Sequence, residues 1–559
     1  NALGGNTTGA SNAAFGVSAL YANTTASYNS AFGTNTLDAN TTGANNTAVG
    51  YNVLTASTTA SNNCAFGSQA LAACTTGDQN VAIGYMTMDA NTIGDRNTAV
   101  GNHSLGVYNP SSNEDGYNIA IGYYAMGSTT TGNQNTSVGS YCLATNTTGS
   151  KNTSVGYYSS YLNTTGTEFT AIGAYALYAN TGNYNTAGGY EALKSNTTAD
   201  NNTGFGWNAL KTNNTGARNT ACGYRALSLN TTDDNAAFGS SAMYQTSNGY
   251  KNAAFGSEAM AANTTGYSNT AVGYNALGAN TSGYQNVAMG RDALGSHTTA
   301  KDNTVIGYHA GDAVTTGQRN TIVGADAFTT ATTANNNAAF GWEALYSTTT
   351  GYQNCAFGDN ALRANTTGVL NTAVGRSALA AATTADGNTC VGHGSGDAIT
   401  TGHSNAAFGA SSLSSATTSN YNTALGKQCM QNCTTGAENC AVGSVSMIAL
   451  TTGGSNTSLG RESASVLTTG GNNTLLGKGA GNASSPGGAV TTGSDRIVIG
   501  NNSNTYAGVK ISWTVTSDAR DKADVTDFTH GLSWINQLRP VTYRWDMRTD
   551  YEAGKTPDG

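Results

Sequence analysis

The chain has very little proline and little charge for its length. Only 4 of its 559 residues are proline, and charged side chains make up 10%. It has no run of about 18 or more apolar residues, so we expect no membrane insertion. The net charge is −8 and basic residues do not cluster, which argues against a nucleic-acid partner. A chain with 72 glycines is often disordered, but here the glycines and apolar residues follow a strict repeat, which indicates a folded chain.

A glycine recurs at every 17th position from Gly16 to Gly500, with few exceptions. Such a unit buries its apolar residues only by stacking on its neighbours. Because a unit of this length suffices for one turn of a solenoid, we predict an all-β parallel β-solenoid, or β-roll. Four intervals between these glycines depart from the period, two of them longer and two shorter by one position. The longer ones are Gly101 to Gly122 and Gly477 to Gly500, and the shorter ones are Gly173 to Gly189 and Gly223 to Gly239.

Positions within the repeat are numbered from its glycine. Position −4 is Asn in 27 of 29 units, with Phe169 and Arg496 as exceptions, and position −2 is mostly Ala. Position −1 is aliphatic or Phe nearly everywhere, and position +4 is Leu, Met or Phe in 23 of 28 units. We predict two short strands per coil, with positions −1 and +4 facing the core and the Asn side chains stacked in a ladder. The invariant glycine indicates a positive φ or a contact too close for a Cβ atom.

A compensation supports this assignment of the core. Where position +4 becomes Gly311 or Gly396, position +7 changes from its usual polar residue to Val314 or Ile399. The lost apolar volume is thus replaced three residues later, as expected if both positions face one core.

Three local expectations follow from the repeat. The turn glycine at position −7 is replaced by Ala in several units, for example Ala26 and Ala60, so we do not expect a left-handed conformation there. The two long intervals should loop out at residues 108–116 and 482–490 and leave the register of the coils unchanged. Residues 1–3 read as the middle of a unit, so we expect the chain to begin inside the array.

Neither a metal site nor a cofactor is expected. The 9 cysteines form no Cys-x-x-Cys pair, and no histidine completes a zinc set near Cys429, Cys433 and Cys440. The repeat positions of several cysteines are otherwise held by Ala, Thr or Val, so we interpret them as small buried hydrophobic residues. These cysteines are Cys64, Cys222, Cys355, Cys390 and Cys440.

Aromatic residues form columns along the repeat. Tyr250, Tyr267 and Tyr284 occupy one position in consecutive units, and position +1 is aromatic in ten units. Aromatic faces pack on sugar rings, so a sugar-binding surface is one interpretation; stacked rungs or contacts between chains are the alternative that we favour. The residues at +1 are Tyr51, Tyr85, Tyr123, Tyr157, Tyr190, Trp207, Tyr224, Tyr274, Tyr308 and Trp342.

The repeat resembles two kinds of fibrous protein. The phrase Asn-Thr-Ala-Val-Gly-Tyr-x-Ala-Leu, as at residues 269–277, is similar to the head repeats of trimeric autotransporter adhesins and to the fibre repeats of bacteriophage tail fibres. Those head repeats form a left-handed parallel β-roll in each of three chains. The resemblance therefore implies a homotrimeric fibre with parallel chains.

The C-terminal residues depart from the repeat. Residues 517–522 read Ser-Asp-Ala-Arg-Asp-Lys, and after a short helical pattern residues 538–545 read Leu-Arg-Pro-Val-Thr-Tyr-Arg-Trp. This resembles the opening of the endosialidase-type intramolecular chaperone domain of phage tail spikes and fibres. The resemblance implies a domain that trimerises the fibre, assists its folding and cleaves itself off, with Ser517 as nucleophile and Lys522 as its base. Four apolar residues should be buried in this cap: Leu532, Ile535, Leu538 and Trp545.

These observations predict three regions and one function. The regions are a β-solenoid shaft (1–508), a linking strand (509–516) and a partial chaperone domain with a small α+β fold (517–559). The resemblances imply an extracellular tail-fibre shaft on a virion, expected to be that of a phage, that positions or mediates host attachment. The implied partners are two further copies of the chain, an upstream fibre or tail protein, and a host cell-surface glycan or protein. The alternative is the head of a cellular trimeric autotransporter adhesin.

An enzyme that acts on an external substrate is not expected. Glycoside hydrolysis needs two carboxylates placed about 5–10 Å apart. The 31 acidic residues are scattered, and pairs such as Asp233-Asp234 have no companions at the same place in adjacent units. Self-cleavage by Ser517 and Lys522 is the one catalytic activity that the resemblance implies.

Overall fold

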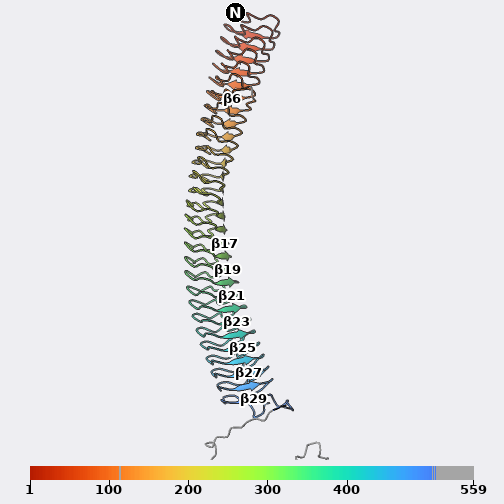
Figure 1. The fold of residues 1–559 in the computed structure, drawn as a ribbon, viewed down its shortest axis with the longest axis vertical. Coiled ribbons are helices and arrows are strands. Elements are labelled where there is room, and N and C mark those ends of the chain that lie inside the picture. Colours follow the sequence, from red (N-terminus) through yellow and green to blue (C-terminus); the bar gives the residue numbers. More distant parts are fainter. Residues whose placement is uncertain (113–114, 507, 509, 511–559) are drawn as a thin grey trace, which may run out of the picture. The chain divides into compact units, whose positions relative to one another are not determined.

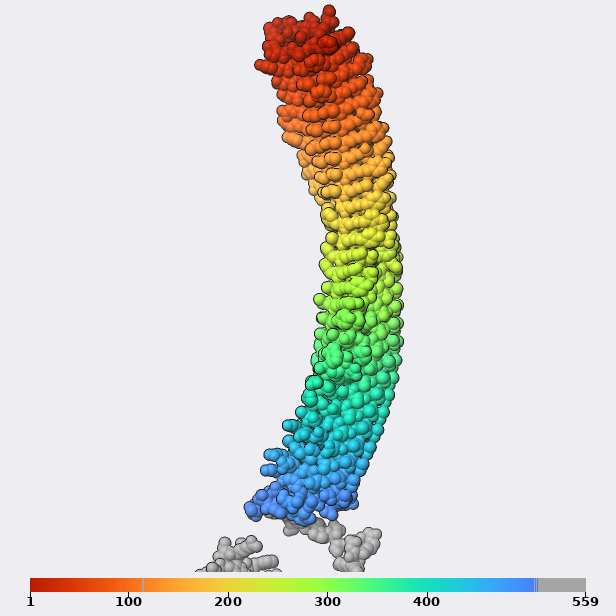
Figure 2. Space-filling view, turned by 180° about the vertical axis from the view of Figure 1, so that it is seen from behind, coloured from red at the N-terminus to blue at the C-terminus, as the bar shows by residue number. Residues whose placement is uncertain are grey.

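The computed structural model describes residues 1–112, 115–506, 508 and 510. The chain divides into two units, Asn1–Ser503 and Asn504–Gly559, and nearly all described residues belong to the first. The first unit is a long, gently curved stack of coils (Figure 1). Figure 2 shows its successive coils in direct contact. Within the described ranges, no helix has the length and apolarity that a membrane crossing requires.

Each coil contributes one strand of three residues, at positions −3 to −1. Neighbouring coils pair in parallel, so that the strands form one 29-stranded sheet. Each strand residue pairs with the residue at the same position of the next repeat, as Thr270 does with Val287. The strands are β1 (Ala13–Phe15), β2 (Ser30–Phe32), β3 (Thr47–Val49), β4 (Cys64–Phe66), β5 (Val81–Ile83), β6 (Thr98–Val100), β7 (Ile119–Ile121), β8 (Thr136–Val138), β9 (Thr153–Val155), β10 (Thr170–Ile172), β11 (Thr186–Gly188), β12 (Thr203–Phe205), β13 (Thr220–Cys222), β14 (Ala236–Phe238), β15 (Ala253–Phe255), β16 (Thr270–Val272), β17 (Val287–Met289), β18 (Thr304–Ile306), β19 (Thr321–Val323), β20 (Ala338–Phe340), β21 (Cys355–Phe357), β22 (Thr372–Val374), β23 (Thr389–Val391), β24 (Ala406–Phe408), β25 (Thr423–Leu425), β26 (Cys440–Val442), β27 (Thr457–Leu459), β28 (Thr474–Leu476) and β29 (Ile497–Ile499).

The predicted all-β parallel solenoid is confirmed, but the predicted core is wrong in one position. In the coil of β16, the residues at −2, +3 and +4 (Ala271, Ala276 and Leu277) are fully buried. Position −1 faces outward instead, since Phe255 is 43% exposed. Successive residues of a strand point to opposite faces, so a buried −2 forces −1 outward. The second predicted strand is also absent from the described coils, because positions +1 to +6 form turns.

The repeat glycine has both properties that its invariance indicates. Gly273 has a φ of +129°, and a Cβ atom on it would lie 2.6 Å from the carbonyl oxygen of Gly290 in the next coil. The turn glycine differs, as predicted: Gly266 is not among the residues with positive φ. Ala26 and Ala60 occupy the same column and are buried there.

The predicted asparagine ladder runs through the core at position −4. The Asn286 backbone N–H and side-chain Nδ2 both donate to Oδ1 of Asn269 in the preceding coil, at 3.0 and 3.1 Å. The same Nδ2 also donates to the carbonyl of Ala300. The buried Asn286 amide therefore makes hydrogen bonds within its own coil and to both neighbouring coils.

A second ladder lies at position +7, and the sequence reasoning missed it. Asn280 Nδ2 donates to Asn263 Oδ1 at 2.9 Å, and Asn280 Oδ1 accepts from the backbone N–H of Gly283. The adjacent threonine at +8 donates its hydroxyl to the carbonyl of the matching threonine in the next coil, as from Thr264 to Thr281. These bonds explain why the turn reads Asn-Thr-Thr-Gly.

The predicted volume compensation is confirmed. Val314 and Ile399 are buried in the coils of Gly311 and Gly396. Position +4 has a left-handed backbone, with φ near +50° in most coils and +59° at both glycines. Glycine therefore fits this position without strain, and only its missing volume must be replaced.

In the remaining coils that lack a large residue at +4, another buried apolar residue also replaces the missing volume. Leu467 is buried in the coil of Ala464, and Val490 in that of Gly481. In the coil with Ser160 at +4, the buried apolar residue is Phe169, which stands in the asparagine ladder. Phe169 supplies no side-chain acceptor, and in the next coil Asn185 Nδ2 donates to Asn180 Oδ1 instead.

Both long intervals keep the register, as predicted. Thr98 pairs with Ile119 across the first insertion, and Thr474 pairs with Ile497 across the second. Tyr108 and Val490, which bound the predicted loops, are themselves 1% exposed. The loops are thus shorter than predicted, because each of these residues contributes to the core.

We expect Gly273→Ala to lower the free energy of unfolding by at least about 2 kcal/mol, because the new Cβ meets backbone at a strained φ. Gly106→Ala is the control and should have a much smaller effect, because the φ of Gly106 is not positive and a Cβ atom there would lie no nearer than 3.5 Å to the surrounding atoms. Denaturant unfolding of the two variants compares them. Equal losses in both would contradict the role given to the repeat glycine.

A buried histidine makes one coil sensitive to acid. His297 replaces Asn at position +7; its Nδ1 contacts Asn280 Oδ1 at 3.1 Å, while its Nε2 has no hydrogen-bond partner. Burial lowers the pKa of His297 to about 4. The unfolded chain therefore binds more protons than the folded chain between pH ~4 and ~6.5, so stability falls as the pH falls through this window.

We expect acidification from about pH 7 to pH 4 to remove on the order of 3 kcal/mol of stability through His297. His297→Asn restores the residue of the ladder and should reduce the acid-induced fall in unfolding temperature. Thermal unfolding at the two pH values tests this. An unchanged fall in the variant would show that His297 is not responsible.

Candidate interaction surfaces

The outer face of the sheet carries a continuous apolar column. Position −1 is hydrophobic in every coil except those of Gly188 and Cys222. Many of these side chains are exposed, and the rings of Phe238 and Phe255 stack on each other at 4.8 Å. We call the outward residues at −1 from Phe15 to Ile499 the apolar column. Contiguous exposed apolar surface of this kind marks a site of protein interaction.

Four cysteines lie on the outer face of this sheet, so the interpretation of all cysteines as buried is wrong for them. Cys222 and Cys440 are exposed, and Cys64 and Cys355 are half-buried. Their positions, −1 and −3, both point away from the core. The interpretation holds for Cys390 at position −2, where burial raises the pKa of the thiol to about 12.

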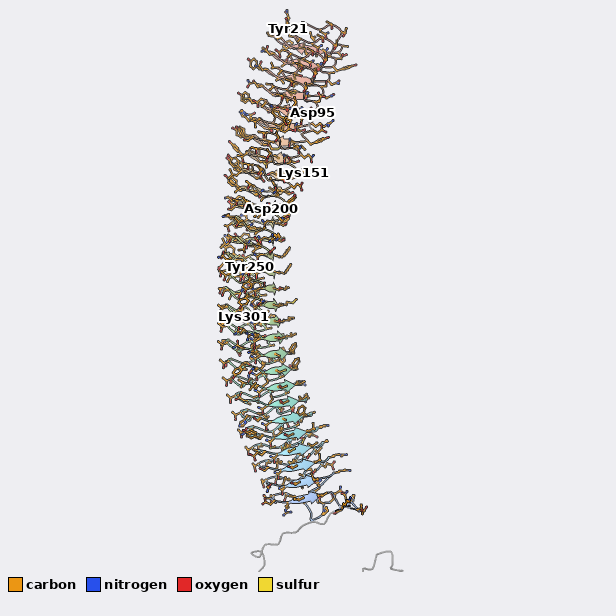
Figure 3. The ribbon with its side chains drawn as sticks, in the orientation of Figure 1. Tyr21, Asp95, Lys151, Asp200, Tyr250 and Lys301 are labelled. Carbon is orange, nitrogen blue, oxygen red and sulfur yellow. The ribbon has the colours of Figure 1, made fainter. Side chains whose placement is uncertain are left out.

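Another edge of the coils carries positions −6 and −5. Five residues of this edge are labelled in Figure 3, from Asp95 through Lys151, Asp200 and Tyr250 to Lys301, and they shift gradually across the view. The edge therefore winds slowly around the unit, as the twist of a parallel sheet requires.

The tyrosine column at −6 stacks as favoured from the sequence. Tyr267 lies 5.1 Å from Tyr250 and 4.7 Å from Tyr284, with nearly parallel rings. Tyr250 also lines a hollow of about 350 Å³ beside the short interval that ends at Gly239. Two carboxylates in this hollow are engaged by one cation.

This cation is Arg218. Its Nε lies 2.7 Å from Oδ1 of Asp234, and its Nη2 lies 3.4 Å from Oδ2 of Asp233. The hydrogen bond from Arg218 lowers the pKa of the Asp234 carboxyl. The Asp234 carboxylate therefore stays ionised and lacks the raised pKa of a general acid.

Tyrosines gather on the edge formed by positions +1, +2 and +5. Position +2 is tyrosine in four consecutive coils, and the neighbouring positions add four more. We call this group the tyrosine patch. Its members are Tyr123, Tyr124, Tyr141, Tyr157, Tyr158, Tyr161, Tyr175 and Tyr178. The sequence reasoning found Tyr123 and Tyr157 but missed the rest, although the run at +2 was a readable signal.

The rings of the patch have two orientations. At +2, Tyr158 stacks on Tyr141 at 4.9 Å and on Tyr175 at 5.7 Å, with angles of 14° and 4°. At +1, Tyr157 stands at 88° to both Tyr158 and Tyr175, and Tyr123 stands at 79° to Tyr141. At +2, Tyr141, Tyr158 and Tyr175 are half-buried under one another, whereas the end ring Tyr124 is 38% exposed. At +1, Tyr123 and Tyr157 are 44% and 49% exposed.

A charged group bounds the patch in the next coil. Glu191, at +2, forms ion pairs with Lys194 at 2.6 Å and Lys211 at 2.7 Å. Burial alone would raise the pKa of Glu191, but the hydrogen bonds from the two lysines outweigh burial and lower it. The Lys194 ammonium also lies 5.2 Å from the ring centre of Tyr175.

The predicted catalytic pair lies outside the described residues. This holds for Ser517 and Lys522, for the four apolar residues predicted in the cap, and for residues 511–516 of the linking strand. The domain limits and the roles of Ser517 and Lys522 therefore stay predictions.

Comparison with known proteins identifies the C-terminal segment. A family model described as the chaperone of endosialidase matches residues 517–558. This match confirms the resemblance that residues 517–522 and 538–545 indicate. No curated protein matches the chain at a significant level.

Proposed function

We propose that the chain is the shaft of a viral tail fibre, a structural and adhesive homotrimer that positions or mediates attachment to a host surface. The observation that carries the proposal is the match of residues 517–558 to the chaperone of endosialidase, in a chain whose first unit is a β-solenoid. A cellular adhesin head would share the solenoid, but the chaperone match favours the viral fibre. The virus is a phage in this proposal, and the fibre is extracellular.

The apolar column supports a trimer of parallel chains. A single chain leaves Phe255 43% exposed, and burying the rest of such a ring is worth about 1 kcal/mol. The column continues through the coils from β1 to β29, so three parallel copies would bury it along the shaft. A closed symmetric assembly fits a surface that is the same on every chain.

The C-terminal segment has a second role in the proposal. Ser517 is the nucleophile and Lys522 is its base in a self-cleavage that acts on the chain and on no external substrate. A lysine serves as the base if burial lowers its pKa into the neutral range. The segment also brings the three chains together while the fibre folds.

The trimer is tested by charges placed in the apolar column. We expect Phe238→Asp with Phe255→Asp to weaken the trimer by several kcal/mol, because carboxylates would be buried without partners. Tyr250→Asp with Tyr267→Asp is the matched control and should leave the trimer intact, since Asp occupies position −6 at Asp200 and Asp233.

Analytical ultracentrifugation and thermal unfolding measure both variants. A stable folded monomer of the unsubstituted chain would overturn the proposed trimer. Equal behaviour of the two double variants would show that the apolar column is not the interface.

Self-cleavage is tested in a chain that carries the complete chaperone domain. We expect Ser517→Ala and Lys522→Ala each to leave an uncleaved trimer, because one removes the nucleophile and the other its base. Denaturing gel electrophoresis separates cleaved from uncleaved chains. Efficient cleavage of the Ser517→Ala chain would contradict the assignment.

A further inference from the structure

The tyrosine patch occupies positions where the fold itself does not require tyrosine. At +1, Ser140 and Ala174 alternate with Tyr123 and Tyr157 on the same backbone. At +2, the four tyrosines have φ values from +54° to +58°. Asn, Asp and Gly adopt this conformation more easily, and short polar residues or Gly are the most frequent at +2 in other coils. Local preference therefore does not account for four tyrosines in succession, which points to a functional reason.

The arrangement of the rings suits a ligand that lies along the coil axis. The stacked +2 rings lie across the axis, so Tyr157, which stands at 88° to Tyr158, presents a plane that runs along it. Tyr123 stands at 79° to Tyr141 and 51° to Tyr124, so its plane is more inclined to the axis. These two rings recur every second coil. At roughly 4.8 Å per coil, they lie about 10 Å apart.

We infer that the tyrosine patch binds a neutral polysaccharide whose chain runs along the coil axis. The C–H faces of sugar rings pack on the exposed faces at +1, and the phenol hydroxyls exchange hydrogen bonds with sugar hydroxyls. The two-coil spacing is similar to the length of a disaccharide in an extended chain. This inference deepens the proposed attachment function and rests on it.

The charge of the surroundings selects an uncharged polymer. The Lys194 ammonium that lies on the Tyr175 ring is paired with Glu191. Between Tyr117 and Tyr190 the only charged residues are Lys151 and Glu168. Both lie at −5, on another edge, and they form an ion pair with each other at 3.2 Å. Crowding by neighbouring rings and the hydrogen bond and charge of Tyr157 raise the pKa of Tyr158 to about 12, so its hydroxyl stays neutral.

A second copy of the chain is the other occupant to consider. An interface between parallel copies of a repeat should continue along the shaft, as the apolar column does. The run of tyrosines at +2 instead covers only the four coils that begin at β7, β8, β9 and β10, although single aromatic residues at +1 continue on either side, as at Tyr85 and Tyr190. Its hydroxyl-rich surface also differs from the aliphatic and phenylalanine side chains of the column. Both differences favour a ligand over a subunit contact.

Native gel electrophoresis with a polysaccharide in the gel tests the inference. The probes are hydroxyethyl cellulose, mannan and dextran, each alone, with alginate as an anionic comparison. We expect at least one neutral polymer to retard the full chain more than alginate does. Tyr123→Ser with Tyr157→Ala copies the residues of the neighbouring coils, and it should weaken binding about tenfold or more. Tyr267→Ser is the control and should bind as the unsubstituted chain does.

Each other outcome overturns the inference. These outcomes are no retardation by any neutral polymer, stronger retardation by alginate, or undiminished binding by the double variant. Ultracentrifugation of the double variant is run alongside, and loss of the trimer would identify the patch as a subunit contact. A trimeric chain that fails the gel assay refutes this inference alone, whereas a monomeric chain refutes the proposed trimeric shaft.

Discussion

The close contact between repeat glycines of neighbouring coils sets the spacing on which the rest of the first unit depends. The backbone N–H of Gly273 donates to the carbonyl of Phe255 at 2.7 Å, and no side chain fits between Gly273 and Gly290. At this spacing the Asn286 amide reaches Asn269 and Ala300 together. A larger residue at the glycine would separate the coils and break both ladders, which explains why this position does not vary while others do.

With the spacing fixed, few residue types fit the interior positions, whereas many residue types fit the exterior positions. Inside, a missing +4 side chain is replaced within the same coil, as Val314 and Ile399 show. Outside, position +1 carries Tyr157, Ala174 or Trp207 on one backbone. Because each coil contacts only its neighbours, an outward substitution has a local effect. Outward columns of the solenoid can therefore vary without disturbing its core.

Much of the fold was predictable because the repeat displays its own constraints. The period, the asparagine ladder, the compensation at Val314 and the register across both insertions all follow from spacing in the sequence.

The error at position −1 came from hydrophobicity, which does not distinguish a core residue from an interface residue. Alternation would have corrected it: a ladder Asn at −4 and a small residue at −2 face inward, so −1 faces outward. The prediction of a second strand was wrong because the residues with a left-handed φ at +2 and +4 are not glycines. Residues such as Asn275 and Leu277 adopt this φ, so the sequence does not reveal it. For the sites, spacing revealed the tyrosines at +1, but only the folded coil places those at +2 and +5 on the same edge.

The extent of each surface along the coils distinguishes assembly from recognition. Parallel copies of a repeat meet in the same way at each coil, so an assembly surface has to be apolar at nearly each coil, and the apolar column meets this condition from Phe15 to Ile499. Recognition of a ligand requires only as many coils as the ligand spans. The run of tyrosines at +2 ends at Glu191 and its two lysines, where the strands continue to pair in register. Aromatic residues at +1 continue beyond this point through Tyr190, Trp207 and Tyr224. A tyrosine run confined to four coils fits the inferred ligand, which touches only that part of the chain.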